Sequence, residues 1–235
     1  MAVDTPPFDD VNVRQAMRLL VDRQALVDVT YAGFGSVSND VAGRYTPFYD
    51  EDLVRERDVD QAKFLLKKVG KEGLSVTLQT SSVVEGFTQA ATLLKQQAKE
   101  AGVTVNLQQF DPATYWAKYG TWTFAQTFYY PVTSMDFVWT NTFASTGLLN
   151  ETHWYNSPSF ERTKSLLRES KVTSDESMLT EIWRDLQKLQ FDEGGHINFG
   201  TYDYLDAVAN DVHGLTPSKY LSASGCNLRK AWLSS

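Results

Sequence analysis

The sequence contains a single cysteine, Cys226, so no disulfide can form within its 235 residues. Cysteine content therefore neither indicates nor excludes export from the cell. No segment approaches the roughly 18 consecutive apolar residues of a membrane-spanning helix, so we expect no membrane span. The first ten residues, MAVDTPPFDD, have neither the basic nor the apolar region of a signal peptide. If the natural protein is exported, we expect its signal to lie outside this sequence.

The sequence also lacks any run of basic residues, and its net charge is −7. Nucleic acids and anionic membranes are bound by stripes of Lys and Arg, so neither is an expected partner. Hydrophobic residues make up 42% of the chain and charged residues 22%, which is ordinary for a soluble globular protein. A chain of this length buries roughly 70% or more of its unfolded surface, so it needs no metal or disulfide to fold.

Signatures of catalysis and of metal binding are missing. The three histidines, His153, His196 and His213, show no HxxxH or HxH spacing, and none lies near Cys226. Metal sites need clustered ligands, so we expect no metal and no cofactor. A lone Gly-Phe-Gly at residues 33–35 is interpreted as a helix end and turn, because a phosphate-binding loop needs a third glycine and a preceding strand.

A group of acidic residues near His213 admits two interpretations. Asp203, Asp206 and Asp211 could supply a carboxylate pair for acid–base chemistry. Alternatively, they occupy solvent-facing positions of two adjacent strands. We favour the second interpretation, because residues alternate between the two faces of a strand and no nucleophile is near.

The periodicity of apolar residues predicts alternating helices and strands, typical of an α/β protein. Helices are expected in two pieces over residues 10–33 and then over 58–70, 86–102, 111–119, 137–143, 156–171 and 174–194. Strands are expected over residues 74–80, 103–110, 121–130, 196–204 and 206–212, with a further one at 228–233. Asp22 and Asp58 are suitable N-caps, and Ser174 is the expected cap of the last helix.

The segment WTFAQTFYYPVTSMDFVW at Trp122–Trp139 is rich in aromatic residues. Phe124 and Phe128 are expected in the core. For Tyr129, Tyr130 and the loop after them, a place in the core and a place in a ligand cleft are equally expected. The cleft is considered because α/β sheets bind ligands at the carboxyl ends of their strands. Tyrosine and tryptophan offer an apolar face with a polar tip, which suits an open cleft.

The opening segment TPPFDDVNVRQAMRLLVDRQALV at residues 5–27 resembles a long signature of the family 5 bacterial extracellular solute-binding proteins, PPFDDxRVRQAL…AIDRxxLV. Further segments are similar to that family: the glycine loop at 33–35 with Pro47, the DQA helix from Asp60 to Gly70, the Ala101–Val103 stretch, and the element from Trp154 to Phe160. The resemblance runs nearly from end to end.

The resemblance implies a type II periplasmic-binding-protein-like lobe, with a mixed sheet flanked by helices. In the family the PPFDD signature opens the C-terminal of two lobes. Residues 1–212 would then form the C-terminal ligand-binding lobe, and residues 213–235 a return segment that joins the N-terminal lobe, which this chain lacks. The implied function is substrate binding for an ABC importer outside the cytoplasm, in the periplasm or as a cell-surface lipoprotein. The implied partners are a peptide-like or other small solute and the permease subunits.

The resemblance also points to site residues. Peptide-binding members carry an Asp just after the aromatic strand, where this sequence has Val132 or Thr133, and the nearest acid is Asp136. An uncharged group cannot pair with an ammonium, which disfavours a free-amine peptide and leaves sugars, modified peptides and metal chelates open. The candidate ligand-binding residues are Tyr129, Tyr130, Thr133, Ser134, Asp136 and Trp139, with Arg44 and Tyr45 as weaker candidates at the cleft edge.

Two other functions remain open from the residues alone. A carbohydrate-active hydrolase would use an Asp/Glu pair beside an aromatic platform, but we find no convincing second carboxylate near Asp136. A ligand-sensing domain of a transcriptional regulator would use the same fold. We expect a non-enzyme.

Overall fold

The computed structural model describes residues 1–129, 134–147, 149–218 and 223–234. Its helices are α1 (Val11–Leu19), α2 (Arg23–Tyr31), α3 (Val59–Lys68), α4 (Phe87–Lys99), α5 (Pro112–Ala117), α6 (Met135–Thr142), α7 (Phe160–Val172) and α8 (Glu176–Glu193). Its strands are β1 (Gly35–Val37), β2 (Ser75–Ser81), β3 (Thr104–Phe110), β4 (Gly200–Tyr202), β5 (Val212–His213) and β6 (Trp232–Leu233). Short 3-10 turns are η1 (Trp154–Asn156), η2 (Ala223–Cys226) and η3 (Leu228–Lys230). The predicted α/β class is confirmed.

Aspartate side chains cap the N-termini of the first three helices. The carboxylates of Asp10, Asp22 and Asp58 accept hydrogen bonds from backbone N–H groups in the first turns of α1, α2 and α3. These caps satisfy donors that have no partner within the helix. The predicted cap of α8 is wrong by one residue, because Asp175 rather than Ser174 accepts the N–H of Met178.

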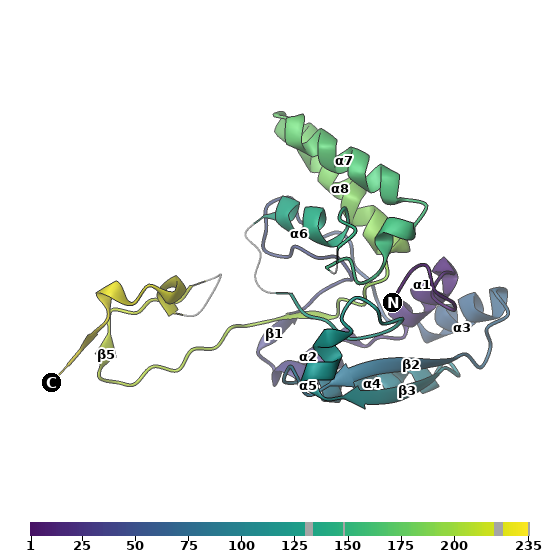
Figure 1. Cartoon of the computed structure of the whole chain (residues 1–235), viewed down its shortest axis with the longest axis horizontal. Coiled ribbons are helices and arrows are strands. Elements are labelled where there is room, and N and C mark those ends of the chain that lie inside the picture. Colours follow the sequence, from purple (N-terminus) through teal and green to yellow (C-terminus); the bar gives the residue numbers. More distant parts are fainter. Residues whose placement is uncertain (130–133, 148, 219–222, 235) are drawn as a thin grey trace.

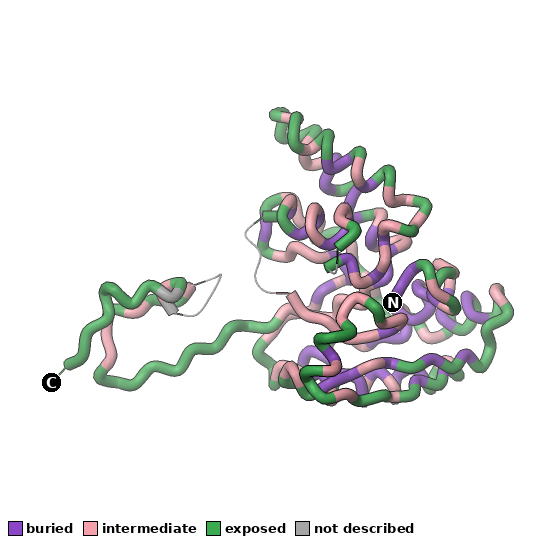
Figure 2. Tube along the Cα trace, viewed as in Figure 1, coloured by how far each residue is buried: buried purple, intermediate pink, exposed green. Residues whose placement is uncertain are grey.

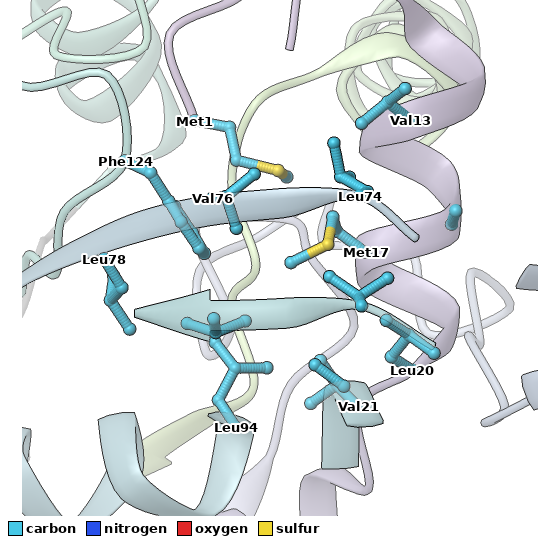
Figure 3. Packing of buried hydrophobic residues seen from close by; sticks show 14 of the residues in the cluster. Met1, Val13, Met17, Leu20, Val21, Leu74, Val76, Leu78, Leu94 and Phe124 are labelled. Atoms are coloured by element: carbon cyan, nitrogen blue, oxygen red, sulfur yellow. The ribbon is translucent and has the colours of Figure 1, made fainter. Parts of the chain in front are cut away.

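Strands β2 and β3 pair in parallel, from Ser75 opposite Thr104 to Ser81 opposite Phe110, as the strand–helix–strand spacing predicts. Helix α4 connects the two strands along the chain and packs against the pair (Figure 1). The first core lies here, where α1 and α3 meet the strands. Figure 3 shows Met17 of α1 beside Leu74, which precedes β2, and Val76 of β2 beside Met1.

Two predicted strands are much shorter in the structure. Over residues 121–129 the predicted strand is reduced to a single parallel bridge between Ala125 and Gln79. The carbonyl of Gln126 accepts a hydrogen bond from Tyr115 Oη over 2.5 Å, instead of pairing with the backbone of a neighbouring strand. The predicted strand 196–204 is reduced to β4, which pairs antiparallel with β1.

The predicted strand 206–212 is also wrong, because only its last residue, Val212, lies in a strand; β5 pairs antiparallel with β6. After β4 the chain leaves the body as an extended segment that is exposed along most of its length (Figure 2). Asp203, Asp206 and Asp211 are exposed on this segment rather than on adjacent strand faces. The described strands therefore form three separate two-stranded pairs.

A second core lies among α6, α7 and α8, which stand apart from the β2–β3 layer in Figure 1. Among its members, the side chains of Trp139, Phe143 and Trp154 are each at most 1% exposed. The indole of Trp154 donates to Thr163 Oγ1 on α7 over 3.0 Å, so this buried ring has a polar partner. No helix within the described ranges combines the length and the apolar character needed to cross a bilayer.

Candidate functional site

A cavity of about 660 Å³ is the candidate site. Its walls include residues of both cores, such as Leu78 and Val138. Aromatic side chains form much of the lining: Tyr31, Phe87, Trp122, Phe124, Phe128, Tyr129 and Phe199. Small-molecule sites are concave, mostly apolar and about 300–1,000 Å³ in volume, so this cavity suits a small solute.

Three polar side chains from distant segments meet on the cavity wall. His196 Nε2 lies 2.9 Å from Glu151 Oε1 and 3.5 Å from Tyr129 Oη. The Tyr129 hydroxyl donates a short hydrogen bond to the same Glu151 oxygen. The second oxygen, Oε2, is buried and has no hydrogen-bond partner. Glu151 is therefore anchored to Tyr129 and His196 through one carboxylate oxygen.

Asn150 fixes the turn that presents Glu151. Its side-chain amide donates to the carbonyl of Ser145 over 2.8 Å, and its Oδ1 accepts from the N–H of Trp154 over 2.9 Å. The Asn150 residue is 1% exposed, so these bonds form in a dry environment. Buried amide hydrogen bonds hold the turn in one conformation and so set the position of the neighbouring carboxylate.

His196 is positioned by the end of α8 and by Arg18 of α1. Arg18 is fully buried, and its guanidinium donates to the carbonyls of Phe191 (2.7 Å), His196 (3.0 Å) and Gly194. At Gly195 an added Cβ would lie 2.1 Å from the Met1 carbonyl oxygen, so only glycine allows this close approach. Backbone contacts thus bring the His196 ring to Glu151.

Opposing effects act on the Glu151 carboxyl group. Burial raises its pKa, but the hydrogen bond and charge of His196, with the hydrogen bond of Tyr129, outweigh burial and hold the pKa below its ordinary value. Burial first, and then the charge of Glu151, raise the pKa of Tyr129 well above its ordinary value. At neutral pH the site therefore contains a carboxylate held by a protonated phenol.

Another buried charge lies on the cavity wall but is fully paired. Asp40 Oδ2 lies 2.7 Å from Arg23 Nη2 and 2.6 Å from Arg55 Nε, and the Asp40 side chain is 0% exposed. A carboxylate with two guanidinium partners has no capacity left for a ligand. We assign this ion-pair cluster to the fold and not to the site.

The predicted site residues fall into three groups. Tyr129, Arg44 and Tyr45 line the cavity. Tyr45 is 65% exposed, and its hydroxyl donates to Ser36 Oγ over 3.2 Å, which places it at the rim. Tyr130 and Thr133 lie outside the described residues.

The structure places Ser134, Asp136 and Trp139 elsewhere, and they are not among the described residues that line the cavity. The Ser134 hydroxyl caps α6. Asp136 has a half-exposed side chain 3.5 Å from Lys171 Nζ. The Trp139 ring is 0% exposed in the second core, because its apolar surface packs against Phe143 at 4.7 Å between ring centroids.

Sequence reasoning missed Glu151 and His196. Glu151 lies inside Asn-Glu-Thr, a triplet that occurs often by chance, and His196 is one of three scattered histidines. No local pattern joins them, since their contact depends on segments 45 residues apart. Within the described part of the chain, no three His, Cys, Asp or Glu side chains are grouped so that they could hold a metal ion.

Comparison with known proteins gives a family match. A model of the bacterial extracellular solute-binding proteins, family 5, middle region, matches residues 1–157. Di/tripeptide-binding protein 1 of Pseudomonas aeruginosa is 29% identical over 116 residues, which cover 48% of this chain and 21% of that protein.

Solved structures show a similar fold over the whole chain. HbpA2 from Haemophilus parasuis matches with a TM-score of 0.81 and 19% identity, covering 100% of this chain and 47% of that one. DppA from Helicobacter pylori, in complex with the peptide STSA, matches with a TM-score of 0.78 and 18% identity, covering 100% and 46%. The chain thus spans less than half the length of each of these proteins.

Proposed function

The chain belongs to the family 5 bacterial extracellular solute-binding proteins, and from this premise we propose that it is one lobe of the substrate-binding component of an ABC importer. It binds a peptide-like or similar small solute reversibly, and a second lobe closes over the bound solute. The observation that carries the proposal is the aromatic cavity of about 660 Å³ with the Glu151 carboxylate on its wall. The names of the matched relatives, such as di/tripeptide-binding protein, agree with this function.

We propose that the domain boundary lies near residue 212, with residues 213–235 returning to another lobe. Large apolar side chains of the extended segment support this: Leu205 is 61% exposed, Trp232 57% and Leu233 69%. Apolar side chains grouped on one segment favour burial against a further surface. The proposed location is extracytoplasmic, in the periplasm or at the cell surface as a lipoprotein.

We propose binding without catalysis. The hydrolase alternative relied on Asp136, and that side chain pairs with Lys171 at a half-exposed position on α6. Glycoside hydrolysis needs two carboxyl groups on opposite sides of the scissile bond. At the Glu151 site the carboxylate is instead held by a phenol and an imidazole, which is an arrangement for positioning a charge.

A titration of the chain with three probes tests the proposal. Dialanine, glutathione and the nickel–histidine complex are added in turn, and the indole N–H signals of the six tryptophans are followed by NMR. We expect saturable shifts with at least one probe, and mass spectrometry should recover that probe unchanged. Binding should be weak, in the millimolar range, because a second lobe would supply half of the buried contact. Chemical conversion of a probe, or no saturation with any of the three, contradicts the proposal.

A further inference from the structure

The imidazole ring of His153 lies between two hydrogen-bond acceptors. Its Nδ1 is 2.8 Å from Asp4 Oδ1, and its Nε2 is 2.8 Å from the carbonyl oxygen of Gly120. A neutral imidazole has one N–H donor and one acceptor nitrogen, whereas the imidazolium donates from both nitrogens. Because a carbonyl oxygen has no proton to donate, the contact with Gly120 requires a proton on Nε2.

Asp4 is held as an anion on the other side of the ring. Its Oδ2 accepts from the side-chain amide of Asn156 over 2.7 Å, and its Oδ1 accepts from Thr5 Oγ1 over 3.0 Å. Burial raises the pKa of Asp4, but the hydrogen bonds of Asn156 and His153 outweigh burial and lower this pKa. An ionised carboxylate cannot donate either, so the contact with Asp4 requires a proton on Nδ1. Both contacts therefore form together only when the His153 ring is charged.

The contacts of this ring join segments that are far apart in the sequence. Asp4 lies in the N-terminal segment, and Gly120 lies in the turn that follows α5. His153 itself ends the turn that carries Glu151, and its backbone N–H donates to the Asn150 carbonyl over 2.9 Å. Gly120 and Glu151 both line the candidate cavity, so the ring connects two parts of the cavity wall.

The charged and titratable groups that these segments carry around His153 are Asp4, Lys118, Tyr119, Glu151 and Tyr155. Asp4 forms an ion pair with the ring, and the Tyr155 ring lies 5.7 Å from it between centroids. The other three have partners of their own: Trp122 for Lys118, Thr127 for Tyr119 and His196 for Glu151. Among the described residues, Asp4 thus decides which ring nitrogen keeps its proton.

We propose that the charged ring of His153 is a pH-sensitive clasp, which fixes the cavity wall at residues 119–122 to the turn that carries Glu151. When the ring loses one proton, the remaining N–H stays on Nδ1, because a hydrogen bond to a carboxylate is stronger than one to a neutral carbonyl. Nε2 then faces the Gly120 carbonyl as a second acceptor, so this contact breaks and the wall is released. His153 is a positioning residue in this scheme.

The clasp regulates the proposed solute site, and in this respect the inference rests on the proposed function. The cavity keeps its shape only while the ring is charged, so solute affinity should fall as the pH rises. The shape of the wall itself can be followed without any solute, which separates the two proposals.

The test follows the full chain by NMR over about pH 5 to 8, the range in which histidine side chains change charge. Long-range ¹H–¹⁵N spectra report whether each ring nitrogen carries a proton. We expect both nitrogens of His153 to be protonated at the acidic end, and Nε2 alone to lose its proton as the pH rises. The Gly120 carbonyl ¹³C signal and the Trp122 indole N–H signal should shift with the same midpoint as the ring.

The variant Asp4→Asn should uncouple the wall from the charge of the ring. An amide can turn its NH₂ group toward His153 Nδ1 and its oxygen toward Asn156, so a neutral ring with its proton on Nε2 satisfies every contact. In D4N the Gly120 signal should therefore stay fixed while the ring loses its proton. The control is His213→Gln, because His213 Nε2 faces Ser234 Oγ at 3.1 Å, and a hydroxyl can donate or accept. H213Q should keep the wild-type profile.

Three results would overturn the inference. One is a Gly120 signal that does not follow the midpoint of the His153 ring in wild type. The second is a Gly120 signal in D4N that shifts with pH as it does in wild type. The third concerns a probe that saturates in the titration with dialanine, glutathione and nickel–histidine: its affinity should fall with rising pH more in wild type than in D4N, and an equal fall contradicts the clasp. If none of these probes binds, the proposed function fails, while the ring and carbonyl signals still decide the clasp.

Discussion

The imidazole Nε2 of His196 lies 2.9 Å from Oε1 of Glu151, and this contact joins the linker after α8 to the turn before η1. Neither segment is a regular helix or strand at that point. The contact holds a carboxylate at the cavity wall and lowers its pKa against the effect of burial.

Replacing His196 by Gln is expected to raise the pKa of Glu151. Burial alone raises this pKa, and His196 supplies the largest opposing effect. A carboxyl group with a lowered folded pKa stabilises the fold above its ordinary value of 4.5, and this stabilisation is lost as pH falls through the folded pKa. H196Q should therefore be less stable at neutral pH and lose less stability on acidification. Carboxyl ¹³C titration and thermal unfolding from neutral to acidic pH measure the two effects.

The matched control for that variant is His153→Gln. His153 Nδ1 lies 2.8 Å from Asp4 Oδ1, and His153 is among the side chains that lower the pKa of Asp4. This variant should raise the pKa of Asp4 and leave that of Glu151 unchanged. An equal shift of Glu151 in both variants would show that His196 acts only through the net charge of the protein.

Arg18→Met is expected to destabilise the fold by about 3 kcal/mol, because it leaves buried carbonyls at the end of α8 without donors. Arg162→Met removes a guanidinium from an exposed pair with Asp185 and should change stability by less than about 1 kcal/mol. Urea unfolding of both variants gives the two values. Similar values for the two variants would mean that the carbonyls of this linker are not held by Arg18.

Gly195→Ala should destabilise the protein by about 1–3 kcal/mol, the range for forcing atoms into a well-packed site. The new Cβ would meet the Met1 carbonyl oxygen at 2.1 Å and Thr152 Cβ at 2.9 Å. At Gly147 the nearest neighbour is Ser145 Oγ at 3.6 Å, so Gly147→Ala is the control with ordinary contacts. Thermal unfolding compares them, and a stable G195A protein would contradict the close approach that positions His196.

Asp136→Asn should leave solute affinity within about twofold, since its side chain is half exposed and screened by solvent. Tyr129→Ala should weaken binding, because it removes ring stacking worth about 0.5–1.5 kcal/mol and one anchor of Glu151. The NMR titration that reports probe binding measures both. A larger loss of probe affinity in D136N than in Y129A would mean that the ligand binds at the α6 surface near Asp136.

Much of the first half of the fold could be predicted from local signals. Asp10, Asp22 and Asp58 stand where the apolar period of a helix begins, and each caps the helix that follows. The parallel pairing of β2 and β3 follows from the helix that lies between them. Aromatic and β-branched residues predict a strand over residues 121–130. Tertiary contacts decided otherwise, since Gln126 Nε2 donates to the Phe87 carbonyl and Tyr115 binds the Gln126 carbonyl.

The sequence by itself determined the family resemblance, the helices, the caps of α2 and α3, and the aromatic character of the cavity wall, because each depends on residues a few positions apart. Only the tertiary structure decided that Trp139 is core and that Glu151 faces His196. The reason is physical: helix and strand periodicities report which face of an element is buried, but not which distant segment covers it. The Glu151–His196 contact is set by Arg18 and Asn150, whose side chains bind backbone carbonyls, and every residue type offers that acceptor alike.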